Sequence, residues 1–162
     1  MKKWNRKLII LGYAVYLYLL VKIILFKYGP VDIRALWYQL HNVLEVPGMI
    51  QNRLAFANFT PFVSINRNLE RLSNPNDFIN LFGNIALFIP QGIIVRLIGR
   101  GGLFTAFIYS FAWSAALEGT QILLAMGSFD VDDLILNVLG GLIGYAISRI
   151  IITQPIALSK KV

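Results

Sequence analysis

The sequence predicts an all-α membrane protein in which four transmembrane helices are accompanied by a partly helical outer segment between the first two. Composition is the first reason, since 57% of the 162 residues are hydrophobic and 14% are charged, against roughly 45–50% and about 25% in soluble domains. The mean hydropathy of +0.65 is the second. The third is a series of apolar runs of about 20 residues, the length that crosses a hydrocarbon core ~30 Å thick.

Composition also excludes several classes of site. The chain has no cysteine, which rules out disulfides, thiolate zinc sites and cysteine nucleophiles. A single histidine, His41, argues against a histidine-rich metal site and against a Ser-His-Asp triad. The net charge of +7 does not predict nucleic-acid binding, because the basic residues stand at the ends of apolar runs instead of forming one stripe.

The first predicted span covers residues 8–26. Basic residues precede it, as in the n-region of a signal peptide. The apolar stretch is longer than a usual signal-peptide core, however, and no small-residue cleavage site follows it. We therefore expect an uncleaved membrane anchor.

Residues 27–78 form the predicted outer segment, which is too polar to span a membrane and contains four prolines. Between Pro30 and Pro47 an amphipathic helix is predicted, because apolar side chains recur with helical spacing. They are Ile33, Leu36, Trp37, Leu40, Val43 and Leu44. Asp32 is placed to cap this helix, which either lies on the outer membrane interface or packs over the bundle. His41 falls on its polar side and is expected to be solvated.

The remaining predicted spans cover residues 79–98, 103–126 and 134–152. The first two of these are joined by the glycine-rich turn 99–102 and should form an antiparallel hairpin. The acidic stretch 127–133 joins the last two. We expect the four spans and the outer segment to make one membrane domain, residues 1–162.

Orientation follows from the lysines and arginines beside the helix ends. Those on the predicted cytoplasmic side are Lys2, Lys3, Arg6, Lys7, Arg96, Arg100, Arg149, Lys160 and Lys161. Those on the outer side lie in the long outer segment, where the rule is weaker. Seven of the eight acidic residues are also on the outer side, and the eighth, Glu118, is inside a helix. We therefore expect both termini to be cytoplasmic, with membrane lipid, and no nucleic acid, as the partner of the positive charge.

Each of the last three predicted spans carries a polar or small-residue stripe on one helical face. The stripes are Asn80, Asn84 and Gln91, then Ser110, Ser114, Glu118 and Gln121, then Asp133, Asn137, Gly140, Gly144 and Ser148. Polar groups inside a membrane are costly and need a partner or a function. Gly140 and Gly144 form a G-x-x-x-G pair, which allows close approach of a helix from the same chain or from another copy in an oligomer.

The predicted topology brings the polar residues of these stripes together in the outer leaflet. Glu118, for example, lies eight residues before the end of its span, or roughly 12 Å along the helix axis. The candidate ligand-binding residues are Asn80, Asn84, Glu118, Gln121, Asp130, Asp132, Asp133 and Asn137. Arg67 and Arg71 of the outer segment can cover the same site. The alternative is adhesion, in which amides and a protonated or arginine-paired Glu118 hold helices together and Asp132 or Asp133 caps the last helix.

Four blocks of the sequence form an ordered set over more than half of the chain. They are Asn58–Phe62 with the pattern N-x-x-P-F, Asn80–Gly92 with N-x-x-G-N…F-x-P-x-G, Ser114–Gln121 with S-x-x-x-E-x-x-Q, and Asp130–Tyr145 with D-x-D-D…N-x-x-G…G-Y. This set resembles the VanZ-like family. Gln91 departs from it, because the family often has leucine there. Residues 127–129 also lack an arginine that many members carry before the acidic block, so this chain differs in what it binds if that arginine serves a ligand anion.

The resemblance implies a protein of the bacterial cell membrane that lowers susceptibility to teicoplanin-type lipoglycopeptides, and it supplies no reaction. In the first hypothesis the outer-leaflet site binds the drug, a lipid or a lipid-linked cell-wall precursor. In the second, the chain is an intramembrane enzyme that modifies a lipid or polyprenyl headgroup. Glu118 would be its catalytic acid or base, and the cofactor, Mg²⁺ or Ca²⁺, would be held by Asp130, Asp132 and Asp133. A small transporter is the third hypothesis, and four spans without an inverted repeat argue against it.

Overall fold

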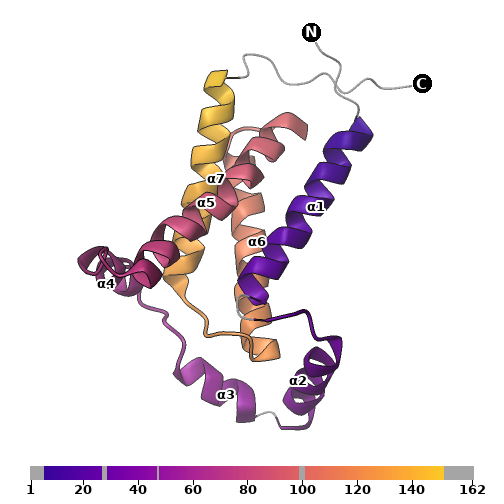
Figure 1. Ribbon diagram of the computed structural model, residues 1–162, viewed down its shortest axis with the longest axis vertical. Coiled ribbons are helices and arrows are strands. Elements are labelled where there is room, and N and C mark those ends of the chain that lie inside the picture. The colour runs from indigo at the N-terminus through magenta and orange to yellow at the C-terminus, as the bar shows by residue number, and fades with distance from the viewer. Residues whose placement is uncertain (1–5, 27–28, 47, 99–100, 152–162) are drawn as a thin grey trace.

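The computed structural model describes residues 6–26, 29–46, 48–98 and 101–151. These residues form helices and no strand, apart from an isolated bridge between Asn58 and Asp130. The helices are α1 (Arg6–Leu25), α2 (Ile33–Glu45), α3 (Gly48–Ala55), α4 (Val63–Glu70), α5 (Pro75–Ile98), α6 (Leu103–Leu124) and α7 (Val131–Ile151). Figure 1 shows α1, α5, α6 and α7 as a bundle, with α2 and α3 at the end opposite to the one where α1 begins and α7 ends. The predicted all-α fold is confirmed.

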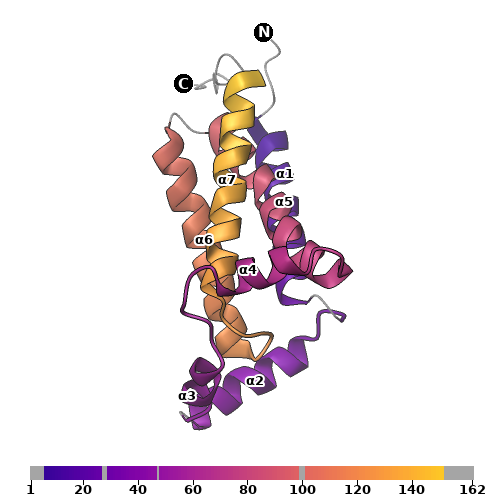
Figure 2. The same cartoon turned by 90° about the vertical axis from the view of Figure 1, so that its left-hand side faces the viewer.

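Three helices of the described residues are long and apolar enough to cross a membrane. They are Lys7–Leu25 of α1, Pro75–Ile98 of α5 and Val131–Ile151 of α7. α6 has 22 residues and packs against α5 and α7 (Figures 1 and 2). It is not among these three helices, however, so length and composition do not confirm it as the predicted fourth span.

α5 begins at Pro75, earlier than the predicted start at Ile79. Asn74 Oδ1 accepts a hydrogen bond from the backbone N–H of Asn76 at 2.9 Å and so caps the first turn. Proline suits this turn, because its missing N–H would have no partner there. The proline expected to interrupt the outer segment is therefore the first residue of the helix.

The connection between α6 and α7 lies earlier in the chain than predicted, at residues 125–130 instead of 127–133. α6 ends at Leu124 and not at Met126, because Ala125 adopts the left-handed conformation with φ of 56°. α7 begins at Val131 and not at Leu134. Two of the three aspartates expected in the loop, Asp132 and Asp133, therefore belong to the first turn of α7. The helix sets their backbone positions.

Glycines bring α5 and α7 into close contact. A Cβ atom added to Gly140 would lie 2.2 Å from the carbonyl oxygen of Ile85, and one added to Gly144 would lie 2.0 Å from that of Ile89. Only hydrogen fits in these gaps, so the two backbones approach directly. The G-x-x-x-G pair thus faces a helix of the same chain.

α1 packs against α5 and α6 through the part of the helix near its C-terminal end. Leu20 and Leu25 form a buried cluster with Phe88 of α5 and Leu117 of α6. The Tyr16 hydroxyl donates to the carbonyl oxygen of Leu87 at 2.9 Å. This cluster, called the Leu20 core below, holds α1 to the rest of the bundle.

The outer segment contains the amphipathic helix predicted between Pro30 and Pro47, namely α2. Asp32 caps it as expected, because its Oδ1 accepts from the N–H groups of Arg34 and Ala35 at 2.9 and 3.1 Å. α2 contacts α6, yet most of its apolar stripe stays uncovered. The exposed fractions are 75% for Ile33, 70% for Trp37 and 72% for Leu44. The contact with α6 therefore leaves one apolar face of α2 uncovered. That α2 lies on the outer membrane interface stays a prediction.

Candidate functional site

The connection before α7 is joined to the outer segment around Asp130. The backbone N–H of Asn58 donates to the carbonyl oxygen of Phe129 at 2.8 Å. The backbone N–H of Val131 donates to the carbonyl oxygen of Asn58 at 2.9 Å. Both Asp130 carboxylate oxygens are also used, one by Asn58 Nδ2 at 2.8 Å and the other by the Ser64 hydroxyl at 2.5 Å. Asp130 therefore fastens the segment between α3 and α4 to the start of α7.

Asp132 caps a helix other than its own. Its side chain is fully buried, and its two oxygens accept the backbone N–H groups of Phe62, Ser64 and Ile65 at 2.6, 2.6 and 3.1 Å. These are the unpaired N–H groups at the start of α4, where negative charge is favourable. Phe62 itself, at φ of 70°, offers no side-chain cap. A residue 70 positions away thus completes α4.

The expected cap of the last helix is corrected by this geometry. Neither Asp132 nor Asp133 caps α7. Asp130 does so, because its Oδ1 accepts the backbone N–H of Asp132 at 2.9 Å. The earlier start of α7 explains the difference, since a capping side chain must stand just before the first helical residue.

Glu118 is buried behind this network, with 1% of its surface exposed. Its Oε2 accepts the backbone N–H of Asp130 at 3.0 Å. No lysine or arginine of the described residues forms an ion pair with it. Arg67, expected to cover the site, instead donates from Nη2 to the Ser64 hydroxyl at 3.1 Å, at the edge of the network. Glu118 thus ties the end of α6 to the start of α7.

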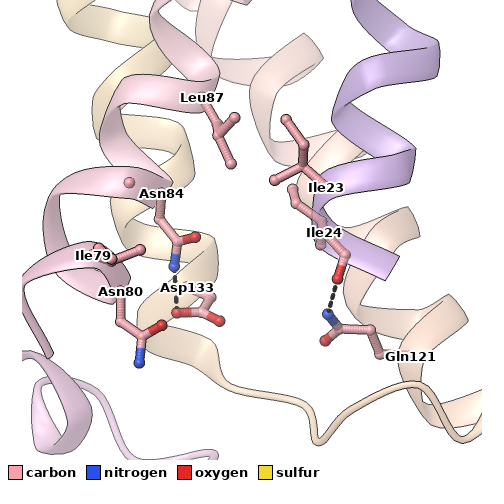
Figure 3. Close-up of a pocket in the computed structure, with 9 residues that line it drawn as sticks. Ile23, Ile24, Ile79, Asn80, Asn84, Leu87, Gln121 and Asp133 are labelled. Carbon is pink, nitrogen blue, oxygen red and sulfur yellow. Dashed lines mark hydrogen bonds between the residues drawn. The ribbon is translucent and has the colours of Figure 1, made fainter. Parts of the chain in front are cut away.

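A small pocket opens between α1, α5, α6 and α7, with four of the predicted polar residues in its wall (Figure 3). We call it the amide pocket. Its polar lining is Asn80, Asn84, Gln121 and Asp133, its apolar lining is Ile23, Ile24, Ile79, Gly83 and Leu87, and its volume is about 110 Å³. Amide groups both donate and accept, while the carboxylate only accepts when ionised. The pocket can therefore bind a small polar group beside a hydrocarbon surface.

Two hydrogen bonds orient the walls of the amide pocket (Figure 3). Asn84 Nδ2 donates to Asp133 Oδ1 at 2.6 Å and so links α5 to α7. Across the pocket, Gln121 Nε2 donates to the carbonyl oxygen of Ile24 at 3.4 Å and so links α6 to α1. The second bond is long, which leaves the Gln121 amide able to exchange its partner for a ligand.

The eight predicted site residues thus fall into three groups. Asn80, Asn84, Gln121 and Asp133 line the amide pocket. Glu118, Asp130 and Asp132 form the network that joins α4, α6 and α7. Asn137 lies deeper, where its Nδ2 donates to the Ser114 hydroxyl at 2.9 Å.

Asp130, Asp132 and Asp133, proposed from the sequence as a cation site, are not grouped in a way that could hold a metal ion. Among the described residues, no three His, Cys, Asp or Glu side chains are grouped so that they could hold a metal ion. The oxygens of Asp130 and Asp132 face N–H and O–H donors, and a donor hydrogen occupies the lone pair that a cation would need. The donor set therefore does not fit Mg²⁺ or Ca²⁺ on Asp130, Asp132 and Asp133.

Sequence reasoning missed Ser64 as a partner of the acidic residues. Ser64 supplies both a backbone N–H and a hydroxyl, to Asp132 and Asp130 respectively. The nearby Asn58–Phe62 block was the available signal, because it belongs to the VanZ-like pattern, but nothing in it named the aspartates as its partner. Only the folded chain pairs the two.

Comparisons with known proteins agree with these motifs. A family model described as VanZ/LLP1 matches residues 13–152. The chain is 27% identical over 132 residues to Protein VanZ of Enterococcus faecium, which covers 81% of this chain and 67% of that protein. No solved structure matches.

Proposed function

Because the chain belongs to the VanZ/LLP1 family, we propose that it is a multi-pass membrane protein that lowers susceptibility to teicoplanin-type lipoglycopeptides. The resemblance of its motifs to the family supplies this physiological context. Its apolar composition and its three long apolar helices support a place in the membrane. The amide pocket is the proposed binding site.

The proposal includes α6 as a fourth span and both termini on the cytoplasmic side. α6 runs along α5 and α7 (Figure 2), and a fourth span returns the chain to the side from which it started. Lys7 near the start of α1 and Arg149 near the end of α7 support this orientation, because positive charge is retained on the cytoplasmic side. The amide pocket then opens in the outer half of the membrane.

The observation that carries the proposal is a pocket that gathers three amides and one carboxylate beside aliphatic side chains of largely apolar helices. Polar groups at membrane depth need hydrogen bonds, and the Gln121 amide, held by one bond of 3.4 Å, can donate to a ligand instead. Lipoglycopeptides and lipid-linked cell-wall precursors both join a polar group to a lipid chain. A volume of about 110 Å³ admits a small part of such a polar group.

The geometry favours binding over catalysis. Glu118, the candidate acid or base, does not line the pocket and accepts a backbone N–H instead. A catalytic acid or base must come within hydrogen-bond reach of the reacting group. Asp130 and Asp132, the other carboxylates expected in a reaction, are used to hold α4 and α7 in place.

Gln121→Leu tests the proposal with little risk to the fold, because it removes a pocket amide held by one 3.4 Å bond. Gln51→Leu is the matched control, since Gln51 is an exposed amide on α3 outside the pocket. Each variant would be expressed in a susceptible host, with membrane protein levels equalised. We expect Gln121→Leu to lose most of the protection against teicoplanin and Gln51→Leu to keep it. Full protection by a folded Gln121→Leu would overturn the amide pocket as the site.

A further inference from the structure

A second hollow lies in the cleft between α1, α5 and α6, nearer the end where α1 begins. It is lined by Ile10 and Tyr13 of α1, by residues of α5 that include Ile94 and Ile98, and by Thr105 and Tyr109 of α6. Its volume of about 320 Å³ exceeds the 110 Å³ of the amide pocket. We call it the apolar groove, because its walls are mainly aliphatic and aromatic.

The Leu20 core separates the apolar groove from the amide pocket. Along α1, the groove residue Tyr13 comes first, Leu20 follows seven residues later, and the pocket residue Ile24 comes four residues after that. α6 has the same order, with Leu117 as its core residue, and the antiparallel α5 has it in reverse, with Phe88 as its core residue. The two hollows are therefore separate sites in one cleft.

The groove is closed at the core end by a link between α1 and α5. Gln91 Nε2, on a fully buried side chain, donates to the Tyr13 hydroxyl at 3.2 Å. Beyond this link, Ile10 stays half exposed and the groove opens outward. An occupant would thus lie along α1 and be stopped at Tyr13.

The surroundings of the groove determine what can fill it. α1 and α5, which supply two of its walls, are among the apolar candidate spans, and the neighbouring α1 residues Leu11 and Val15 are also exposed. At the depth of a membrane span the surrounding medium is acyl chain. Water does not fill an apolar hollow, whereas apolar ligands do, and an empty groove would forfeit the dispersion contacts of its walls.

We propose that the apolar groove binds one acyl chain of a membrane phospholipid, which enters from the surrounding bilayer and lies between α1, α5 and α6. The bound acyl chain fills the space between α1 and the other two helices beyond the Leu20 core. The proposal does not depend on the amide pocket or on its ligand, because the two sites share no lining residue.

Filling the groove with a larger side chain tests the proposal. The purified full chain, in a sterol-based detergent that has no alkyl chain, would be titrated with dioleoylphosphatidylcholine and followed by native mass spectrometry. We expect the unmodified chain to retain one phospholipid. Ile10→Trp and Ile98→Trp should each lose this adduct, because indole occupies the volume of the acyl chain.

Leu11→Trp is the matched control, since Leu11 is adjacent to Ile10 and similarly exposed, at 61% against 50%, but does not line the groove. It should retain the adduct, as should Gln121→Leu in the amide pocket. Thermal unfolding of every variant in the same detergent verifies the fold, and Ile10→Trp alone decides the matter if Ile98→Trp does not fold. No adduct on the unmodified chain, or equal retention by Ile10→Trp and Leu11→Trp, would overturn the proposal.

Discussion

Asp132 and Asp32 both cap helices, but they act over different distances. Asp32 uses one oxygen for the N–H groups of the two neighbouring residues Arg34 and Ala35, at the exposed start of α2. Asp132 is buried and uses both oxygens for a helix that begins about 70 positions earlier in the chain. The same residue type therefore serves local structure in one place and tertiary structure in the other.

Replacing Asp132 with asparagine should lower the free energy of unfolding by about 1.5–3 kcal/mol, the range for a hydrogen bond to a charged group. One accepting oxygen becomes an NH₂ group, which cannot accept from the backbone of α4. Denaturant unfolding in detergent measures the loss. Asp32→Asn is the control, because asparagine caps equally well, and it should change stability by less than about 0.5 kcal/mol. Equal losses in the two variants would contradict the difference in their roles.

At the scale of elements, the interface between α5 and α7 depends on the absence of side chains. Gly92 of α5 and Gly140 and Gly144 of α7 each face backbone atoms of the other helix at distances that leave no room for a Cβ. Close backbone contact of this kind stabilises membrane helices through dispersion, where the hydrophobic effect contributes little. It also determines how near Asn84 of α5 comes to Asp133 of α7.

Gly144→Ala should lower the free energy of unfolding by about 1–3 kcal/mol, because its Cβ would lie 2.0 Å from the carbonyl oxygen of Ile89 and the helices would have to separate. Thermal unfolding in detergent checks this. Gly119→Ala in α6 is the matched control, since no atom lies within 4 Å of its added Cβ. Alanine is the better helix former there, so the control should not be destabilised. A Gly144→Ala variant as stable as Gly119→Ala would refute the packing argument.

At the scale of the whole molecule, the decisive question is whether α6 crosses the membrane. Gly102 and Ser128 flank α6 and are both exposed, and the chain has no native cysteine. The proposed four-span topology puts these two positions on opposite sides. A three-span chain in which α6 does not cross puts them on the same side.

Single-cysteine variants at these positions test the topology. A membrane-impermeant maleimide applied to intact cells should label Ser128→Cys and leave Gly102→Cys unlabelled, since the positive charge near the start of α1 is expected inside. Detergent should then make both positions reactive, which serves as the control for accessibility. The same result at both positions, whether both or neither are labelled in intact cells, would reject α6 as a span, and the reverse pattern would reject the orientation.

The local parts of the structure were predictable because their causes are local. Helical spacing of apolar residues and the cap at Asp32 led to α2, and runs of apolar residues led to the long helices. The helix starts at Pro75 and Val131 were missed, because the capping side chains of Asn74 and Asp130 stand in stretches that composition alone marks as loop.

The candidate site was predictable in membership but not in arrangement. Polar residues on three helical faces were expected to converge, and Asn80, Asn84, Gln121 and Asp133 do share a pocket. Nothing in the spacing showed that Asp130 and Asp132 would turn toward Ser64 and its neighbours in the outer segment. For this reason the surroundings of these two carboxylates do not fit the cation site proposed from the sequence.

Composition and residue spacing were enough to predict a helical protein of membrane composition and to identify the residues available for polar contacts. Those properties follow from hydrophobic content and from the helical period, and both can be read from residues that are close together in the sequence. Which carboxylates hold the helices together and which line a pocket became clear only from the folded chain. Hydrogen bonds depend on distances of about 3 Å between atoms, and the residues they join here stand as many as 97 positions apart.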